Sequence, residues 1–485
     1  MRYCILAAAT TLGLVWPSCL IHAGDAALRE QAATAMRRAT EFFRTQVSTE
    51  GGYLWRYSED LSLREGEGTA TDTMIWVQPP GTPSVGMVYL TAYEATGDEY
   101  YLEAARDAAY ALVSGQLRSG GWDYRIEFEP ERRRRYSYRV DPDPRQNARN
   151  VSTMDDNNTQ SATRLLMQVD RALDFKDEKI HEAARFALSA ILKVQYPNGA
   201  WPQRFTEAPD PAKFPVKKAC YPESWSWTFP ERDYKSFYTF NDGSIADTID
   251  VMLEAFEIYG RAEYRTAAEK AGDFIILAQM PEPQPAWAQQ YNADMQPAWA
   301  RKFEPPAVTG GESQGVMRIL LTLYRETGEK RYLEPLPRAI EYLRRSRLPD
   351  GRLARFYELK TNKPLYLTRG DYKVTYSDAD MPTHYSFKQS NGIEGIAREY
   401  ERLLAMDPGE LNRPKKAAPR MSRTLATRAK SAIDRLDGQG RWVERGNMRK
   451  DTQDAPIRRV IDCRTFIGNI RALSAYLAAG SERNQ

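Results

Sequence analysis

The chain has few of the residues from which metal sites and catalytic triads are commonly built. Of its 485 residues, 4 are cysteine and 3 are histidine. Once a predicted leader, described next, is set aside, only Cys220, Cys463, His181 and His384 remain. Thiol-rich or histidine-rich zinc sites, Ser-His-Asp catalysis and Cys-His catalysis therefore all lack residues. Proton transfer must fall to carboxylates, lysine, arginine or tyrosine, and at most one disulfide, Cys220 to Cys463, is expected in an oxidising compartment.

Long hydrophobic runs are also missing, apart from a short one at the N-terminus. Residues 5–16 are mostly apolar and follow Arg2, and Ala23 before Gly24 is typical of a signal-peptide cleavage site. Residues 1–23 are therefore predicted to be a secretory signal peptide, which implies a secreted or periplasmic protein. No later segment approaches the roughly 18 consecutive apolar residues of a membrane-spanning helix, so no membrane partner is expected.

Neither sign of charge dominates, because 68 lysines and arginines stand against 65 aspartates and glutamates. A balance of this kind gives no indication of a nucleic-acid partner. Arginines nevertheless cluster in the run Arg132 to Arg135, and they recur near aromatic residues. This mixture favours a polyanion over a neutral glycan as the partner. The alternative for the run itself is an ordinary solvated basic face.

The middle of the chain repeats a helical hairpin. Its unit is a first helix, a turn often holding glycine, a tyrosine-rich second helix, and a glycine-rich turn with an aromatic residue. Within Ser244–Tyr259 the apolar residues recur at helical spacing and leave one polar face, so each hairpin has one side to bury. The predicted first helices are Val85–Thr96, Ser161–Leu173, Ser244–Tyr259 and Ser313–Thr327, and the second helices are Glu99–Leu117, Asp177–Val194, Ala262–Gln279 and Lys330–Ser346.

The spacing of the repeats, roughly 70 to 85 residues, is longer than that of short helical solenoids. Turns such as Gly120-Gly121-Trp122 follow the second helices, and long aromatic loops separate the hairpins. Long ordered loops in a compact domain tend to carry function. We therefore expect an all-α fold in which repeated helical hairpins form an α/α barrel, or toroid, with the long loops at one end. An α-solenoid binding protein is the alternative.

Three regions are expected after the signal peptide. Residues 24–407 are predicted to form the α/α-barrel domain. Residues 408–422 are rich in lysine, arginine and proline, which is typical of a linker. Residues 423–485 are predicted to form a C-terminal helical extension that closes the array.

Seven motifs lie in order at the junctions of the hairpins. They are Asp155-Asp156-Asn157-Asn158-Thr159; Trp201-Pro202-Gln203-Arg204-Phe205; Thr239-Phe240-Asn241-Asp242; Trp287-Ala288-Gln289-Gln290-Tyr291; Ala300-Arg301-Lys302-Phe303-Glu304-Pro305-Pro306; Gly310-Gly311-Glu312-Ser313; and Ala354-Arg355-Phe356-Tyr357-Glu358, followed by Thr361-Asn362-Lys363-Pro364 and Arg369. Taken together, over residues 80–375, they resemble the pectate lyases of polysaccharide lyase family 10. The chain departs from the family at Asp156, where asparagine is usual, and in an insert near residues 209–233.

The resemblance implies an α/α-barrel lyase that acts on polygalacturonate and needs calcium. An acidic polysaccharide such as pectate is then the expected partner. By the same resemblance, Asp155 and Asp242 are calcium or active-site ligands. Arg301 matches the arginine that is taken as the proton-abstracting base, and Arg355 with Arg369 matches a pair that resembles the clamp on the substrate carboxylate.

Four further residues of these motifs are expected to bind substrate, namely Trp201, Arg204, Tyr357 and Lys363. For Trp201 the alternative is a place in the core, where tryptophan is common. Its position at the end of a hairpin favours the cleft.

The chemistry of these residues suits β-elimination across C4–C5 of a uronate, because the proton removed is α to a carboxylate. A hard divalent cation on Asp155 and Asp242, with guanidinium groups from Arg355 and Arg369, would stabilise the enolate-like charge. The pKa of a free guanidinium lies above about 12. We therefore expect neighbouring positive charge to lower the pKa of Arg301.

Other roles stay open for the same residues. Asp242 precedes a helix and can cap it, and Arg355 can pair with Glu358 three positions on. An α/α-barrel glycoside hydrolase acting on uronyl oligosaccharides would use Asp155 and Asp242 as its carboxylate pair, and calcium dependence distinguishes it from a lyase. A non-catalytic pectin-binding protein is disfavoured by the three retained arginines. The protein is expected to be a monomer.

Overall fold

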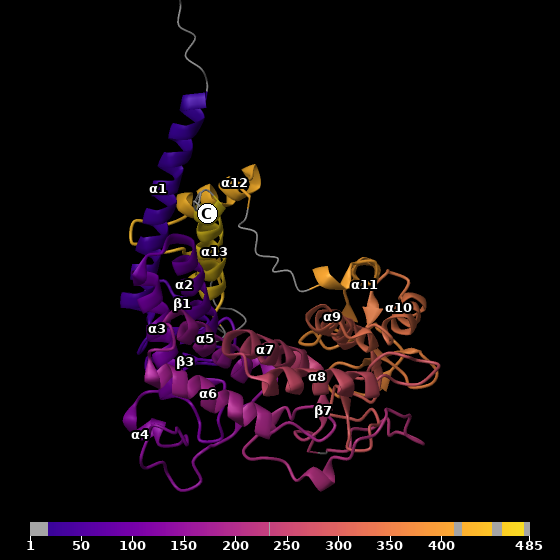
Figure 1. The fold of residues 1–485 in the computed structure, drawn as a ribbon. Helices are drawn as coiled ribbons and strands as arrows, with labels where there is room; N and C mark the ends of the chain where they lie inside the picture. The colour runs from indigo at the N-terminus through magenta and orange to yellow at the C-terminus, as the bar shows by residue number, and fades with distance from the viewer. Residues whose placement is uncertain (1–17, 232, 412–419, 449–457, 480–485) are drawn as a thin grey trace, which may run out of the picture.

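The computed structural model describes residues 18–231, 233–411, 420–448 and 458–479. The chain is mainly helical (Figure 1). Residues 1–17 of the predicted signal peptide and 412–419 of the predicted linker lie outside the described residues. The helices are α1 (Ser18–Phe42), α2 (Thr82–Thr96), α3 (Glu99–Ser114), α4 (Pro130–Arg133), α5 (Asn158–Ala172), α6 (Glu178–Lys193), α7 (Ser244–Tyr259), α8 (Ala262–Leu277), α9 (Gly310–Thr327), α10 (Leu336–Arg345), α11 (Ile393–Leu404), α12 (Arg423–Asp434) and α13 (Cys463–Ala479).

The helices pair into hairpins that follow one another around the molecule. Helices α2, α5, α7 and α9 pack successively against one another, and α3, α6, α8 and α10 each pack against the helix before them. Helix α13 packs against α1 and α2 and so extends the row at its other end. Figure 1 shows the row as a curve that runs from α13 and α2 through α5 and α7 to α9. The expected fold class, an all-α chain of helical hairpins in an α/α barrel, is confirmed.

The strands are short, from two to five residues. They are β1 (Arg56–Ser58), β2 (Arg64–Glu65), β3 (Met74–Trp76), β4 (Arg125–Glu127), β5 (Ser152–Thr153), β6 (Arg204–Phe205), β7 (Tyr238–Thr239), β8 (Gln290–Tyr291), β9 (Val308–Thr309), β10 (Leu353–Ala354), β11 (Phe356–Tyr357), β12 (Pro364–Leu367), β13 (Val374–Thr375), β14 (Lys388–Gln389), β15 (Glu444–Gly446) and β16 (Arg458–Asp462).

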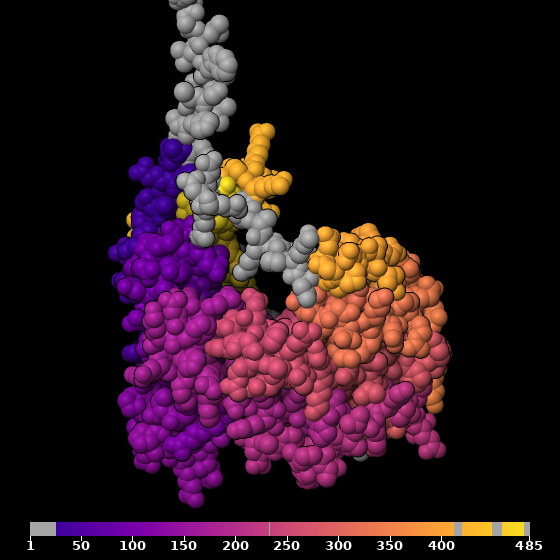
Figure 2. All heavy atoms as spheres, in the orientation of Figure 1, coloured from indigo at the N-terminus to yellow at the C-terminus, as the bar shows by residue number. Residues whose placement is uncertain are grey.

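A pair of antiparallel strands ties each hairpin together at one end. The strand before the first helix pairs with the strand after the second, as β3 does with β4, β5 with β6, β7 with β8 and β9 with β11. Strand β16, before α13, pairs in the same way with β1, after α1. The two ends of the described chain thus meet in one hairpin. In Figure 1, β7 lies below α7 and α8, and Figure 2 shows the lower side formed by the purple-to-magenta segment that holds the loops after α3 and α6.

Buried tryptophans fasten the turns after the second helices. Each ring donates its Nε1–H to a backbone carbonyl near the end of the preceding helix. The pairs are Trp122 with Leu112, Trp201 with Ile191, Trp287 with Ile275 and Trp442 with Ala432, at 2.8 to 2.9 Å. These bonds satisfy carbonyls that a helix end leaves without an intrahelical partner.

This arrangement corrects two of the expected substrate contacts. Trp201 is only 1% exposed, so its ring belongs to the core and offers no face to a sugar. Tyr357 is equally buried, and its hydroxyl donates to the carbonyl of Ser346 at 2.6 Å. This hydrogen bond holds the turn after α10 against the end of that helix, as the tryptophan bonds do for the other turns.

One predicted helix is divided. The segment expected as a single helix, Lys330–Ser346, is a 3-10 turn, Lys330–Tyr332, followed by α10, Leu336–Arg345. Pro335 lies between the two pieces and has no backbone N–H for an α-helical bond. The other predicted helices of the repeats are present with shifted ends, except Ser244–Tyr259, whose ends agree.

Cys220 and Cys463 are separate free thiols, so the expected disulfide is absent. Cys463 is buried at the start of α13, where its Sγ lies 3.0 Å from the carbonyl oxygen of Leu54. Cys220 is exposed and lies beside the backbone of Asp294.

Over the described ranges, no helix combines the length and apolar character needed to cross a bilayer.

Candidate active site

The same local structure precedes two neighbouring helices, α5 and α7. A strand leads into a 3-10 turn, Asp155–Asn157 before α5 and Asn241–Gly243 before α7. At the second turn position Asp156 has φ 51° and Asp242 has φ 49°, in the left-handed region that aspartate tolerates better than most residues. The repeat therefore places a carboxylate at one equivalent point in each of two adjacent hairpins.

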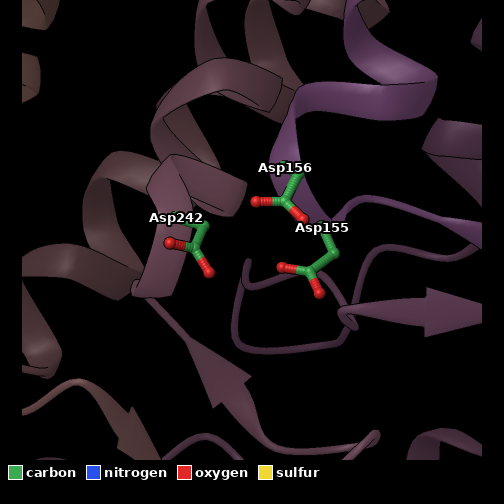
Figure 3. Close-up of side chains that lie close together, drawn as sticks. All are labelled: Asp155, Asp156 and Asp242. Atoms are coloured by element: carbon green, nitrogen blue, oxygen red, sulfur yellow. The ribbon is translucent and has the colours of Figure 1, made fainter. Parts of the chain in front are cut away.

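Three carboxylates meet at these turns and form what we call the acidic cluster: Asp155, Asp156 and Asp242. Each supplies one oxygen, and these oxygens lie within 4.8 Å of one another. Figure 3 shows Asp242 on one side and Asp155 and Asp156 on the other, with their carboxylates turned toward a common space. The sequence predicted Asp155 and Asp242 as partners. It did not predict Asp156, which the motif comparison had marked only as a departure.

The cluster is electrostatically unfavourable without a cation. Burial, followed by the charges of Asp155 and Asp242, raises the pKa of Asp156 to about 7. Burial and the charge of Asp155 raise the pKa of Asp242 to about 6, against the opposing effect of Arg301. Crowded carboxylates resist ionisation together, and a bound cation relieves this repulsion.

Several oxygens at the turns also lack hydrogen bonds. Asp155 Oδ1 is buried with no partner among the described residues, and the same holds for the side-chain oxygens of Asn157, Asn158 and Asn241. Buried polar atoms without partners call for an explanation such as an ion. Carboxylate and amide oxygens are the ligands that calcium prefers. The residues at these turns therefore fit a hard divalent cation.

Two side chains contact the buried member of the cluster from the other side. The hydroxyl of Tyr124 donates to Asp155 Oδ2 at 3.0 Å. Arg204 Nη2 lies 3.9 Å from the same oxygen. Arg204 was predicted as a substrate contact, and the structure places it at the cluster. Tyr124 carries no motif signal and was missed.

Arg301 lies between two acids. Its Nε donates to Glu304 Oε2 at 3.0 Å, and its Nη2 lies 3.4 Å from Asp242 Oδ2. Burial lowers the pKa of Arg301, but Glu304, Tyr385, Asp155 and Asp242 together outweigh it and raise the pKa above its ordinary value. The expectation of a lowered pKa is therefore wrong for this structure. The neighbouring cation, Lys302, instead lies 4.3 Å from the ring centre of Tyr372.

Arg355 is held close to the same region. Its side chain is 11% exposed, its Nη2 lies 3.4 Å from Glu312 Oε1, and its guanidinium carbon lies 4.0 Å from the ring centre of Tyr385. Tyr385 in turn donates to Glu304 Oε1 at 2.9 Å. A cavity of about 240 Å³ is lined by Arg355, Glu312 and Asp242 together. Glu358, the alternative partner of Arg355, instead accepts from Tyr376 at 3.0 Å.

Arg369 and Lys363 contact other residues. The Arg369 side chain is 61% exposed and its Nε lies 3.4 Å from Asp380 Oδ1. Lys363 Nζ lies 5.0 Å from the ring centre of Tyr376. Within the described part of the chain, no ion pair joins either residue to the acidic cluster. The structure thus brings together Asp155, Asp242, Arg204, Arg301 and Arg355, whereas the roles of Arg369 and Lys363 stay predictions.

Tyr385, Glu304 and Glu312 were not singled out from the sequence. Glu304 and Glu312 each lie inside a quoted motif, so the motifs held a signal for them. Tyr385 lies in a segment with only loose similarity to the family.

The basic run, Arg132 to Arg135, is largely neutralised by carboxylates. Arg132 pairs with Glu127 at 3.1 Å, and Arg134 pairs with Glu131 at 3.3 Å.

The family model described as pectic acid lyase matches residues 133–323. Among solved structures, a family 10 polysaccharide lyase from Cellvibrio cellulosa is 20% identical, with 65% of this chain and 96% of that chain covered and a TM-score of 0.45. A mutant of the Cellvibrio cellulosa family 10 lyase in complex with trigalacturonic acid is 20% identical over 66% and 98%, with a TM-score of 0.45. A D-mannose isomerase is 12% identical over 92% and 97%, also at 0.45. No curated protein matches the chain.

The matched segment contains the turns before α5 and α7, with all three members of the acidic cluster, and also Arg204 and Arg301. Arg355, Lys363 and Arg369 lie beyond it. The resemblance that the motifs predicted is thereby confirmed over the half of the site built by α5 and α7. Residues 133–323 thus match the pectic acid lyase family model, and this match supports a lyase enzyme.

Proposed function

We propose that the protein cleaves pectate or a similar polyuronate by calcium-assisted β-elimination, with Arg301 as the base. The observation that carries this proposal is the position of two arginines beside the acidic cluster. Arg301 is 3.4 Å from Asp242, and Arg355 lines one cavity with that same carboxylate. A polyuronate needs cationic groups around its carboxylate, and a lyase needs a base next to them.

Asp155, Asp156 and Asp242 are the residues that would hold calcium. Their oxygens lie within 4.8 Å of one another, and Asp155 Oδ1 has no hydrogen bond from the described residues. When bound, calcium would supply positive charge that neutralises the cluster and the substrate carboxylate. Tyr124 and Arg204 fix the orientation of Asp155, because both contact its Oδ2.

Arg355 is suited to hold the uronate carboxylate. Its planar guanidinium is pressed against Tyr385 and balanced by Glu312, so little side-chain freedom is left to lose on binding. A fixed guanidinium can donate two parallel hydrogen bonds to a carboxylate. The same contact stabilises the negative charge that moves onto that carboxylate when the neighbouring C–H bond breaks.

Arg301 is the group that we propose takes the proton. In the elimination the C5–H bond breaks and its proton passes to the unprotonated guanidine of Arg301, while a double bond forms between C4 and C5. The C4–O bond breaks with its electron pair on the oxygen of the departing sugar, which takes a proton from water. Glu304 orients the guanidinium through its Nε, and Asp242 lies beside its other end. The anionic neighbours keep Arg301 protonated in the metal-free protein, so proton transfer requires that their charge be neutralised first.

The proposal extends to location and organisation. We infer that residues 1–23 direct export, since their apolar run and cleavage pattern match a secretory signal. We also infer a catalytic domain over residues 24–407 and an extension over 423–485. Packing of α13 on α1 and α2 supports an extension that adds to the barrel.

Polygalacturonate with and without calcium provides the test. The purified protein should produce unsaturated uronides, followed by their ultraviolet absorbance, only when calcium is present. A hydrolase would give new reducing ends without that absorbance, and a binding protein would give neither product. Either of these two results would contradict the proposal.

A further inference from the structure

A second cavity adjoins the acidic cluster on the side of α2. It has a volume of about 470 Å³, within the range of about 300–1,000 Å³ that is typical of small-molecule sites. Two segments build it, residues 67–76 and residues 123–149. Most of its lining precedes residue 133 and lies outside the segment that matches the family. The lining residues are Glu67, Gly68, Thr69, Trp76, Asp123, Tyr124, Arg125, Tyr136 and Arg149.

The cavity and the cluster share a wall. Tyr124 lines the cavity, and its hydroxyl donates to Asp155 Oδ2 at 3.0 Å and lies 3.4 Å from Asp156 Oδ2. Glu67, another lining residue, is close enough for its charge to contribute to the raised pKa of Asp156. Tyr124 therefore lies between the cavity and the acidic cluster.

Arg125 gives the cavity a cation that protein carboxylates do not neutralise. The other arginine, Arg149, is paired with Asp123, which is buried. Arg125 has no carboxylate within 4.0 Å among the described residues. Its guanidinium carbon instead lies 5.7 Å from the ring centre of Trp76, its cross-strand neighbour in the β3–β4 pair. A half-buried guanidinium that rests on an aromatic ring keeps its donors available for an anion.

Tyr136 gives the cavity a fixed aromatic wall. Its ring is stacked on that of Tyr138, which is fully buried, at a centroid distance of 5.3 Å and an angle of 16°. Trp76 is also immobile, because its Nε1 donates to Gln78 Oε1 at 3.0 Å and the backbone of Gly66 lies directly on its ring. A Cβ at Gly66 would come within 2.1 Å of the indole. The positions of the arginine and of the aromatic rings are thus fixed in the absence of a ligand.

We infer that this cavity is an additional subsite for one uronate unit of a longer oligouronide, with Arg125 binding the carboxylate and Tyr136 contacting the sugar ring. The inference rests on the proposed function. Beyond the proposed function, the inference states that residues before the family segment extend the binding cleft. The enzyme should therefore favour substrates that are long enough to occupy both the acidic cluster and this cavity.

The test compares short and long substrates in an Arg125→Gln variant. Loss of a charge-assisted contact should raise KM for hexagalacturonate by about tenfold or more, with kcat close to wild type. KM for trigalacturonate, which we expect the acidic cluster to bind without the cavity, should change less than about twofold. Arg134→Gln is the matched control, because Arg134 is exposed and pairs with Glu131 and Asp143 outside the cavity. It should leave both KM values unchanged, and thermal unfolding checks that both variants are folded.

The outcomes separate this inference from the proposed function. If Arg125→Gln alters both substrates equally, or neither, the subsite is refuted while the lyase activity stands. If the wild type has no lyase activity, the proposed function fails, and calorimetric binding of hexagalacturonate to wild type and variant still decides the subsite. Weaker binding by the variant alone supports it, and equal binding, or no binding by either protein, overturns it.

Discussion

Asp156→Asn gives a sharp test of the acidic cluster, because it should stabilise the metal-free protein and yet weaken its response to calcium. The pKa of Asp156 is raised from an ordinary 3.8 to about 7, first by burial and then by Asp155 and Asp242. A rise of this size corresponds to about 4 kcal/mol at about 1.36 kcal/mol per pKa unit. Because Asp156 is partly exposed, solvent screening makes this an upper bound.

The sign of the effect depends on pH. Below about pH 4 the carboxyl is protonated in both the folded and the unfolded chain, so it contributes no difference. Between about pH 4 and pH 7 the unfolded chain releases this proton while the folded protein keeps it, so stability falls as the pH rises. Above about pH 7 the full penalty is present. Asp156→Asn removes the penalty and should raise the unfolding temperature at pH 8 in chelator, but not at pH 4.

Calcium should narrow the difference in stability between the two proteins. A ligand that binds only the folded state at about 1,000 times its Kd adds about 4.1 kcal/mol of stability. The wild type should gain this, and Asp156→Asn should gain clearly less because one carboxylate ligand is lost. The assay is thermal unfolding at pH 4 and pH 8, with chelator and with a calcium titration.

Asp247→Asn is the matched control. Asp247 also has a pKa raised to about 6, chiefly by burial, but it is not a member of the cluster. Its substitution should stabilise the chelated protein at pH 8 and leave the calcium response intact. An Asp156→Asn protein that keeps the full calcium shift, or that is less stable than wild type at pH 8 in chelator, would refute the reasoning.

Three further predictions concern catalysis. Chelation should abolish the formation of unsaturated uronides and added calcium should restore it, as measured by ultraviolet absorbance; activity that survives thorough chelation would exclude the metal. Arg301→Ala should lower turnover by well over tenfold across the pH range while oligogalacturonate affinity stays near wild type. A loss below about tenfold, roughly 1.4 kcal/mol, is too small for the base. Arg355→Lys should lose most activity because an ammonium cannot form two parallel bonds, whereas Arg369→Lys should lose less because Arg369 is exposed beside Asp380. Equal losses in steady-state kinetics would place both arginines on the substrate.

Local sequence predicted the helices well because their determinants are local. Apolar residues at helical spacing placed Ser244–Tyr259 with the ends that the structure has. The prediction failed where a single residue overrode the pattern, as Pro335 did in the predicted helix Lys330–Ser346. Both outcomes depend on hydrogen bonds between residues a few positions apart.

The candidate site was predicted only in part, because its residues come from several hairpins. The motifs named Asp155, Asp242, Arg301 and Arg355, all of which the fold brings to one region. They could not show that Asp156 would join the cluster, because its left-handed backbone angle is set by the turn that the strand pairing creates.

The sequence by itself determined the helical repeat, the scarcity of histidine and cysteine, and the motif order that resembles a pectate lyase. Only the tertiary structure decided the surroundings of each side chain, namely its burial and its charged neighbours. The ring of Trp201 lies in the core, where it donates to a carbonyl at the end of α6. Arg301 has a raised pKa because Glu304, Tyr385, Asp155 and Asp242 together outweigh burial. The sequence states the type of each side chain. Its solvation and its charged neighbours depend on groups far away in the sequence, and solvation and charge together determine its pKa and its chemical role.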